Sequence, residues 1–505
     1  MSKLARPLLR LALILPLFAA APAQAQTHAS WGGLEPGPYA VGFRFVYRLD
    51  HSRGWKASED PDGYPRAEGR GRPVRVGVWY PAVRSARAAR MLYRDYTPRT
   101  APGALFAELN AMLEKRDAAN LRAGLKPEAL AALLTTRVAA VRDAAPHGGD
   151  FPLVVYSAGL NNPPEDNVVL CEYLASRGYV VITVPQAGTT SLDVNLKFPS
   201  PADLETQALD LQFAVGAARD LPGVARGRLG VVGYSVGGVV ALNLVMRNND
   251  VDALVTLDPT FGVGPRVRLA TESPHYHPTK VRVPWLYLYR AEPATSLAVF
   301  DALKYSRRYR LEMKGMSHRD FSSFPLLAPP EDTTAEARRG YETLCRYVLS
   351  FFDAHLKRDA RGPEFVSRAA PEGVAAFEVR EAMRPPPTEE KFLKVLEREG
   401  FARALSLYRE RRAKDPGQPL FSEDFLNQLG YRLLYAEKRP AEAVEIFKLN
   451  VEAYPASANV YDSLGEAYAV SGDKELAIKF YEKSIELNPN NKGAVEAVRK
   501  LRGGQ

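Results

Sequence analysis

A glycine-rich turn between an apolar run and a helical pattern constrains this chain more than any other feature of its sequence. Residues 228–234 read Arg-Leu-Gly-Val-Val-Gly-Tyr, Ser235 follows, and Val-Gly-Gly leads into the apolar segment 239–246. The β-branched run predicts a buried strand, and the spacing after it predicts a helix. A turn this sharp strains the backbone of Ser235 and leaves room only for glycine at 233 and 237. The hydroxyl of Ser235 therefore projects from the strand end, as in a nucleophile elbow.

The first 25 residues have the features of a secretory signal peptide. A start with three basic residues precedes the apolar stretch Leu11–Ala21, and Ala23-Gln24-Ala25 provides a small-residue cleavage site. The apolar stretch is short for a bilayer span, and an uncleaved N-terminal anchor is the alternative. We expect an exported bacterial protein, periplasmic or secreted. No later stretch is apolar enough to predict a membrane span.

The composition bounds the size and class of the fold. Of the 505 residues, 46% are hydrophobic and 25% charged, enough for a large core and a second, smaller domain. The net charge is +9, but no dense basic run is interleaved with aromatic residues, which argues against nucleic-acid binding. Cys171 and Cys345 have no metal-ligand spacing. We expect two buried free thiols, although export permits a disulfide.

Strand and helix patterns alternate over residues 31–368. This alternation predicts an α/β fold with a mostly parallel sheet covered by helices on both faces. The predicted strands are 41–49, 74–80, 151–156, 178–184, 229–232, 252–257, 283–289 and 309–313, and the predicted helices are 165–177, 202–220 and 334–357. Residues 100–143 have helical spacing and precede 151–156, which we expect to be the first buried strand. They therefore predict a helical insertion or lid.

The end of the chain is predicted to be a linker followed by a small all-α domain of helical repeats. Residues 369–390 contain several prolines and few apolar residues, which indicates the linker. Within 391–503, Ala443, Phe447 and Pro455 recur as Ala477, Tyr481 and Pro489, each 34 residues later, and Ala404, Tyr408 and Pro416 form a fainter copy. This spacing resembles tetratricopeptide repeats. A generic pair of helical hairpins is the alternative.

A histidine suited to serve as a base for Ser235 follows the last predicted strand. A serine hydroxyl needs such a base, and the base needs a carboxylate to hold its ring. His318 lies in the segment Gly-Met-Ser-His-Arg-Asp-Phe, just past 309–313, where the base is expected. His355 lies inside the closing helix, and His275 and His277 come earlier without a third ligand at metal spacing. We therefore expect no metal site.

Three carboxylates are candidates for the acid, and the residues alone leave the choice open. Asp258 follows strand 252–257 directly, Glu292 follows the next strand, which is the commoner location beside this kind of elbow, and Asp301 is the third. An aspartate before proline is also a frequent turn residue, which is the structural alternative for Asp258.

Acyl transfer at Ser235 also needs backbone donors for the developing oxyanion. The N–H of Val236, directly after the nucleophile, is one candidate. The second is expected in the loop 157–162 after strand 151–156, because Gly159 allows a turn that points N–H groups inward. An ordinary strand-end loop is the alternative.

Several segments together carry a family resemblance. They are Val78-Trp79-Tyr80-Pro81, the strand and loop 152–160, the elbow, Leu257-Asp258-Pro259 and Ser-His-x-x-Phe-Ser at 317–322. Through them, residues 72–356 resemble the platelet-activating factor acetylhydrolase group of the α/β-hydrolases, which is allied to dienelactone-hydrolase-type esterases. The resemblance implies the α/β-hydrolase fold.

The same resemblance implies roles for particular residues. It selects Asp258 over Glu292 as the acid of a triad with Ser235 and His318, and it assigns the oxyanion donors to the N–H groups of Leu160 and Val236. It implies no cofactor. Ala158 and Tyr234 stand where that family often has histidine. These departures leave the triad intact and concern the substrate pocket.

The sequence therefore predicts an exported serine esterase that cleaves small-molecule or lipid esters, with short acyl groups, through an acyl-enzyme intermediate. Residues 100–143 are expected to shape the acyl pocket. One alternative is a partner-binding protein in which the hydrolase domain is a relic and the repeats recruit a protein. Another is a peptidase on the same fold.

Overall fold

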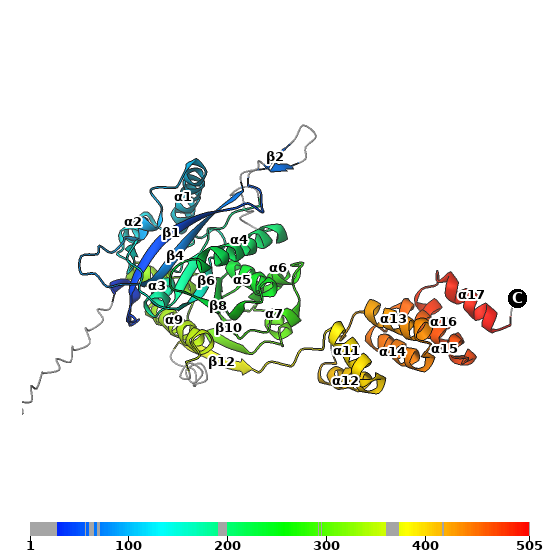
Figure 1. Cartoon of the computed structure of the whole chain (residues 1–505). Coiled ribbons are helices and arrows are strands. Elements are labelled where there is room, and N and C mark those ends of the chain that lie inside the picture. The colour runs from blue at the N-terminus through cyan, green and yellow to red at the C-terminus, as the bar shows by residue number, and fades with distance from the viewer. Residues whose placement is uncertain are drawn as a thin grey trace, which may run out of the picture. The chain divides into compact units, whose positions relative to one another are not determined.

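The computed structural model describes residues 28–55, 57–59, 65–67, 71–189, 199–290, 292–293, 295–359, 373–416 and 419–503. The chain divides into two compact units, Met1–Met383 and Arg384–Gln505 (Figure 1). The predicted signal peptide, residues 1–25, lies outside the described residues.

A ten-stranded sheet forms the centre of the first unit, counted over the described residues, with the order β12-β11-β10-β9-β8-β6-β7-β4-β1-β5. Its strands are β1 (Ala40–Asp50), β4 (Arg72–Ala82), β5 (Val141–Arg142), β6 (Phe151–Ser157), β7 (Val180–Thr183), β8 (Val224–Tyr234), β9 (Val251–Leu257), β10 (Trp285–Arg290), β11 (Arg308–Met313) and β12 (Val374–Arg380). Neighbours from β7 to β11 pair in parallel. β4 pairs antiparallel with β7 and with β1, and β12 pairs antiparallel with β11. A separate hairpin joins β2 (Ala57–Glu59) and β3 (Pro65–Ala67).

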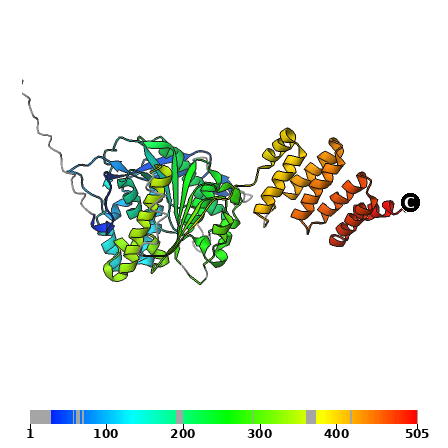
Figure 2. The same ribbon diagram turned by 90° about the horizontal axis from the view of Figure 1, so that it is seen from below.

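Helices cover both faces of this sheet (Figure 2). They are α1 (Ala104–Gly124), α2 (Pro127–Thr135), α3 (Val168–Ser176), α4 (Pro201–Arg219), α5 (Val236–Arg247), α6 (Arg268–Thr271), α7 (Ala298–Ala302), α8 (Phe324–Leu327) and α9 (Ala335–Leu356). Successive side chains of a strand point to opposite faces. On β4, Trp79 therefore enters the core beside α3 and α9, whereas Val78 enters the core beside α4 and α5. This arrangement confirms the predicted α/β-hydrolase class of fold.

The predicted insertion at 100–143 forms α1, α2 and β5. α1 packs Phe106, Leu109 and Leu113 against Trp55 in a small core of its own. The prediction that 151–156 is the first buried strand is wrong, because β4 is buried along its whole length. Along the chain, the insertion therefore comes between β4 and β6, which are both interior strands of the sheet. It does not precede all of the buried strands.

The predicted linker at 369–390 is wrong over residues 374–380. These residues form β12, an edge strand beside β11, so 309–313 is not the last strand. The segment Val-Ala-Ala-Phe-Glu-Val-Arg places Phe377 and Val379 against the core, which explains its position on the sheet. The first unit accordingly extends to Met383 and not 368, and the helical part begins at Glu389 and not 391.

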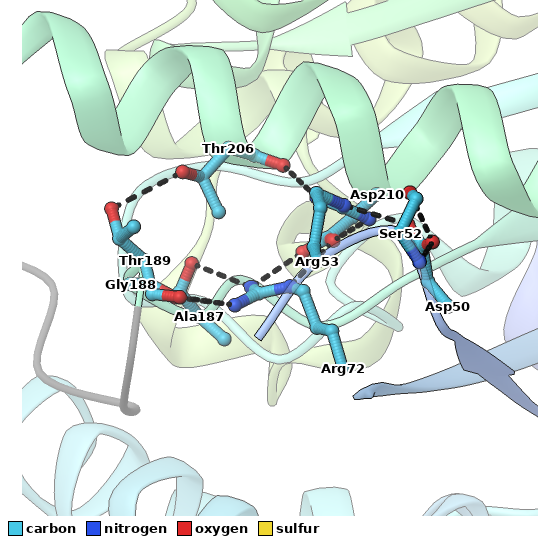
Figure 3. Close-up of polar contacts among 9 residues, drawn as sticks. All are labelled: Asp50, Ser52, Arg53, Arg72, Ala187, Gly188, Thr189, Thr206 and Asp210. Atoms are coloured by element: carbon cyan, nitrogen blue, oxygen red, sulfur yellow. Dashed lines mark hydrogen bonds and ion pairs between the residues drawn. The ribbon is translucent and has the colours of Figure 1, made fainter. Parts of the chain in front are cut away.

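A buried ionic cluster joins the start of β4 to α4 (Figure 3). The guanidinium of Arg72 donates Nε–H and Nη2–H to the two oxygens of Asp210, each at 2.7 Å. It also donates to the carbonyl oxygens of Gly188 at 2.7 Å and Thr189 at 3.0 Å. Arg53 pairs with the same carboxylate at 2.8 Å. A buried charge is tolerated when it is paired and hydrogen-bonded, and here the pairing fixes α4 and the 187–189 segment to the sheet.

The second unit is a series of paired helices. They are α11 (Glu389–Glu399), α12 (Phe401–Lys414), α13 (Glu423–Tyr431), α14 (Pro440–Ala453), α15 (Ala458–Val470), α16 (Lys474–Leu487) and α17 (Lys492–Leu501). A Cβ on Gly430 would lie 2.5 Å from the ring of Phe447, and one on Gly465 would lie 3.0 Å from the ring of Tyr481. In each repeat, the glycine therefore leaves the space that the aromatic side chain of the next helix fills. Ala404 and Tyr408 of the fainter copy are buried in the same core.

Cys171 and Cys345 are free and buried, as predicted. None of the helices in the described part of the chain is long and apolar enough to span a membrane.

Candidate active site

Ser235 lies on a strained turn between β8 and α5. Its φ and ψ are 56° and −122°, a backbone conformation that non-glycine residues rarely adopt. A Cβ on Gly233 would lie 2.2 Å from the carbonyl oxygen of Gly237, and one on Gly237 would lie 2.2 Å from that of Ser157. Both glycines are therefore required by close approach of backbone, as the sequence predicted. The same approach brings the loop after β6 against the elbow.

Ser235, His318 and Asp258 form a continuous hydrogen-bonded line. The hydroxyl of Ser235 lies 2.9 Å from Nε2 of His318, and Nδ1 of His318 lies 2.5 Å from Oδ2 of Asp258. The three residues follow β8, β11 and β9, whose carboxyl ends meet at one edge of the parallel sheet. The side chain of Asp258 is 6% exposed and that of His318 is 41% exposed. A buried carboxylate thus orients an imidazole that solvent and substrate can reach.

Arg290 holds the Asp258 carboxylate from the end of β10. Its backbone N–H donates to Oδ1 at 3.2 Å and its Nε–H donates to Oδ2 at 2.8 Å. Asp258 itself has a φ of 41°, a left-handed backbone conformation that is uncommon for residues other than glycine. Glu292 forms its ion pair with Arg290, and Asp301 pairs with Arg380 of β12. Of the three carboxylates that the sequence left open, Asp258 is the one in contact with His318.

His318 opens a short 3₁₀ turn, His318–Phe321, that is fixed on both sides. The backbone N–H and the hydroxyl of Ser317 both donate to the carboxylate of Asp320 at 2.7 Å. The hydroxyl of Tyr234 donates to the carbonyl oxygen of His318 at 3.0 Å, and the two rings lie 5.2 Å apart. Burial raises the pKa of Tyr234 well above its ordinary value, so this phenol stays a neutral donor. Tyr234 thus supports the backbone of His318.

The loop after β6 is held by side chains from three other places. Oε1 of Gln186 accepts the N–H of Asn161 at 3.1 Å, and its Nε2–H donates to the carbonyl of Ala158 at 2.9 Å. Asn120 of α1 donates to the carbonyl of Asn161 at 2.7 Å. These contacts hold the backbone on both sides of Leu160, at Ala158 and at Asn161.

Asp166 completes this support from the start of the α3 segment. Its Oδ2 accepts the N–H of Gly159 at 3.2 Å and the side-chain N–H of Asn162 at 2.8 Å, and its Oδ1 accepts the hydroxyl of Tyr156 at 2.5 Å. Burial raises the pKa of Asp166 to about 6. The loop therefore presents Leu160 beside the elbow, where Val236 is the first residue of α5 and its N–H belongs to the unpaired first helical turn.

A pocket of about 170 Å³ is lined by Arg319, which directly follows His318, and by residues of the loop after β6. Its walls come from the insertion, from the loop residues Asn162 and Pro163, and from the segment after His318. The lining residues that these elements supply include Asn120, Leu121, Leu125, Ala129, Leu133, Arg319, Phe324 and Leu327. The insertion thus lines a pocket that Arg319, the residue after His318, also lines.

The three histidines that the sequence set aside as bases for Ser235 have other partners. Nε2 of His275 lies 2.8 Å from Arg247 and 3.3 Å from Glu205, and Nδ1 of His277 contacts the hydroxyl of Thr279 at 2.8 Å. His355 packs against Phe351, and burial lowers its pKa to about 4. Within the described ranges, no group of three or more metal-ligating side chains is assembled.

Comparison with known proteins identifies a repeat family in part of the second unit. Residues 458–491 match the family model described as tetratricopeptide repeat, which confirms that resemblance for this part of the second unit. The search of curated proteins gave no match. A solved structure similar to this chain is a ferulic acid esterase from Streptomyces cinnamoneus, with 21% sequence identity and a TM-score of 0.42, covering 66% of this chain and 94% of that one.

Proposed function

We propose that this chain is a serine hydrolase that cleaves carboxylic esters through an acyl-enzyme intermediate. The observation that carries the proposal is the line of contacts from Ser235 through His318 to Asp258. A strained serine at a strand end, an imidazole in contact with it and a buried carboxylate behind the imidazole together meet the requirements for nucleophilic catalysis by a hydroxyl group.

In the proposed mechanism, Nε2 of His318 takes the proton of the Ser235 hydroxyl as its oxygen attacks the ester carbonyl. Asp258 holds the imidazole in the correct tautomer and stabilises the imidazolium that forms. The N–H groups of Leu160 and Val236 stabilise the oxyanion of the tetrahedral intermediate. His318 then gives the proton to the leaving alcohol, which departs and leaves the acyl group on Ser235. Water, deprotonated by the same histidine, releases the acid.

A fluorophosphonate probe tests the nucleophile directly. The pure protein is treated with the probe, and the adduct is located by peptide mass spectrometry. We expect label on Ser235 in the wild type and none in Ser235→Ala. Folded wild-type protein that is not labelled at Ser235 would overturn the proposed nucleophile.

The resemblance to platelet-activating factor acetylhydrolases favours a short acyl group. Arg319, which directly follows His318, and the loop residues Asn162 and Pro163 line the pocket of about 170 Å³ in which such a group would lie. A series of p-nitrophenyl esters from acetate to laurate tests this part of the proposal, with kcat/KM expected to be highest for short chains. A panel of aminoacyl p-nitroanilides tests the peptidase alternative, and we expect no turnover of those amides.

Export is part of the proposal and rests on the leader sequence at residues 1–25. Expression of the full chain in a bacterial host, followed by fractionation and N-terminal sequencing, tests it. We expect a mature chain that begins after Ala25 in the periplasmic or extracellular fraction. A full-length chain retained in the cytoplasm contradicts the prediction.

The repeats of the second unit favour an additional role in binding a protein partner. The tetratricopeptide match at 458–491 supports this, because such repeats stack into extended binding surfaces. Removal of residues 384–505 separates the two roles, since the first unit is compact by itself. We expect the truncated protein to keep its kcat on p-nitrophenyl butyrate, whereas loss of turnover in a folded truncation would link the repeats to catalysis.

A further inference from the structure

A second cavity lies under the insertion, adjoining the pocket beside the triad. It has a volume of about 610 Å³, and it shares the residues Tyr93, Leu121 and Pro163 with that pocket. Its walls include Arg75 of β4, Glu165 of the segment before α3, and Asp117 of α1. None of these residues takes part in the proposed mechanism.

Arg75 is a buried cation with few partners. Its side chain is 4% exposed, yet its one hydrogen bond in the described structure runs from Nη1–H to the amide oxygen of Asn110, at 3.1 Å. The guanidinium also lies 5.1 Å from the ring centre of Phe45. Among the described residues, Arg75 forms no ion pair. Burial lowers its pKa, but a guanidinium stays charged at neutral pH. Its charge is therefore available to a ligand in the cavity.

Glu165 presents a second incompletely satisfied group in the same cavity. It is 5% exposed, and its Oε1 is buried without a hydrogen-bond partner in the described structure. Burial raises the pKa of Glu165 to about 8, so the carboxyl group is mostly protonated at neutral pH and can donate a hydrogen bond. Asp117, in contrast, is already paired with Arg116 at 3.0 Å.

The mouth of the cavity adds positive charge. Arg94, Arg99 and Arg122 are exposed among the lining residues, and Arg99 is paired with Asp95 at 3.3 Å. Glu114 is the exposed acid of the lining. The lining therefore combines exposed arginines with a buried guanidinium and a buried, neutral carboxyl group. Charge-assisted hydrogen bonds from such donors favour a carboxylate or phosphate group over a neutral one.

We propose that this cavity is a binding site for a small oxyanion, a carboxylate or a phosphate, with Arg75 as its charged anchor and Glu165 as a hydrogen-bond donor. The anion belongs either to the distal end of a substrate whose acyl group fills the adjoining pocket, or to a free ligand. The first source rests on the proposed esterase function and the second does not.

Binding is measured with glutarate and with inorganic phosphate, using calorimetry on the Ser235→Ala protein so that turnover plays no part. We expect saturable binding of at least one anion, and none of the neutral analogue glutaramide.

Arg75→Met should weaken the binding about ten- to hundredfold, the effect of losing a charge-assisted hydrogen bond. Arg226→Gln is the matched control, because Arg226 is exposed on β8 and does not line the cavity. No saturable binding to either anion, or undiminished binding in folded Arg75→Met, would overturn the site.

The pH dependence gives a second readout, which also serves if Arg75→Met does not fold. Glu165 faces Arg75 on β4, Asp117 on α1 and Asp166 on its own segment. Above about pH 8 the Glu165 carboxyl ionises, compensates Arg75 and repels the ligand, so anion affinity should fall as the pH rises through its pKa of about 8. Glu165→Gln keeps a neutral donor and should bind at pH 7 without that fall. An unchanged pH profile in Glu165→Gln contradicts the role of Glu165.

The source of the anion is decided by matched esters on the protein with Ser235 intact. 4-Nitrophenyl hydrogen glutarate and 4-nitrophenyl valerate have the same acyl length and differ in the terminal carboxylate. If Arg75→Met lowers kcat/KM for the first ester alone, the anion belongs to the substrate. If both esters are unaffected while calorimetry shows that binding is lost, the site takes a free anion. Failure to hydrolyse either ester contradicts the esterase proposal and leaves the calorimetric result standing.

Discussion

Arg72 and Arg75 lie three positions apart on β4, and both are buried, but their surroundings differ completely. Because side chains alternate across a strand, Arg72 points toward α4 and Arg75 points toward the opposite face. Arg72 is bound by a bidentate carboxylate and by backbone carbonyls (Figure 3). Arg75 contacts one amide oxygen and lines a cavity. The comparison separates a buried charge that holds the framework from one that is left available for a ligand.

Asp258 of the candidate active site is, like Arg72, a buried charge with several partners, but we propose a catalytic role for it. Asp258→Asn should lower kcat about 10⁴-fold on a p-nitrophenyl ester with little change in stability, because the imidazole then loses its orienting carboxylate. Glu292→Gln is the control and should change kcat less than about threefold, since Glu292 contacts Arg290 and not His318. Steady-state kinetics on both variants decides the assignment, and equal or reversed losses would contradict it.

Arg72→Met tests the framework side of the comparison. Removing the guanidinium leaves Asp210 buried and with only Arg53 to pair with it, so the free energy of unfolding should fall by about 3–5 kcal/mol. Urea denaturation monitored by tryptophan fluorescence measures the change. A loss below about 1 kcal/mol would show that this cluster is not a main support of the α4 side of the sheet.

Gln186→Leu tests whether a paired neutral side chain positions the catalytic loop. The substitution keeps the approximate size and removes both hydrogen bonds that bracket Leu160. We expect kcat to fall about ten- to hundredfold with KM nearly unchanged, because a misplaced oxyanion donor weakens transition-state binding more than substrate binding. Gln186→Glu keeps one acceptor and should recover part of the rate. A change confined to KM contradicts this role.

Arg75→Met should give the smallest effect on stability. Because Arg75 has no ionic partner to leave behind, the free energy of unfolding should change by less than about 1 kcal/mol in either direction. The same urea denaturation used for Arg72→Met provides the measurement. A loss as large as that of Arg72→Met would make the two arginines equivalent and remove the distinction drawn between them.

Local patterns were sufficient to predict a large part of this molecule. The elbow around Ser235 was predicted because strand, glycines and helix follow one another within twenty residues. The repeats were predicted because each helix contacts mainly its neighbours, so a period in the sequence is also a period in space. β12 was missed because a short edge strand with few buried residues has a weak pattern, and the prolines nearby indicate a linker more strongly.

The supporting residues of the candidate site had no such local signal. Gln186 reaches a loop 25 positions away in the chain, Asn120 reaches one 41 positions away, and Arg290 contacts a carboxylate 32 positions away. None of them belongs to a motif with fixed spacing. Their partners were not predictable from one sequence, because contacts of this kind depend on which strand ends become neighbours in the sheet.

The sequence by itself determined the strained serine, the alternation of strands and helices, and the period of the repeats, because each is set by steric and hydrophobic preferences over a few residues. Only the tertiary structure decided that Asp258 and not Glu292 contacts His318, that Arg72 is paired, and that Arg75 faces a cavity. These outcomes depend on the order of the strands in the sheet and on the face of the sheet to which each side chain points. Both arise from the packing of the whole sheet and not from any one segment.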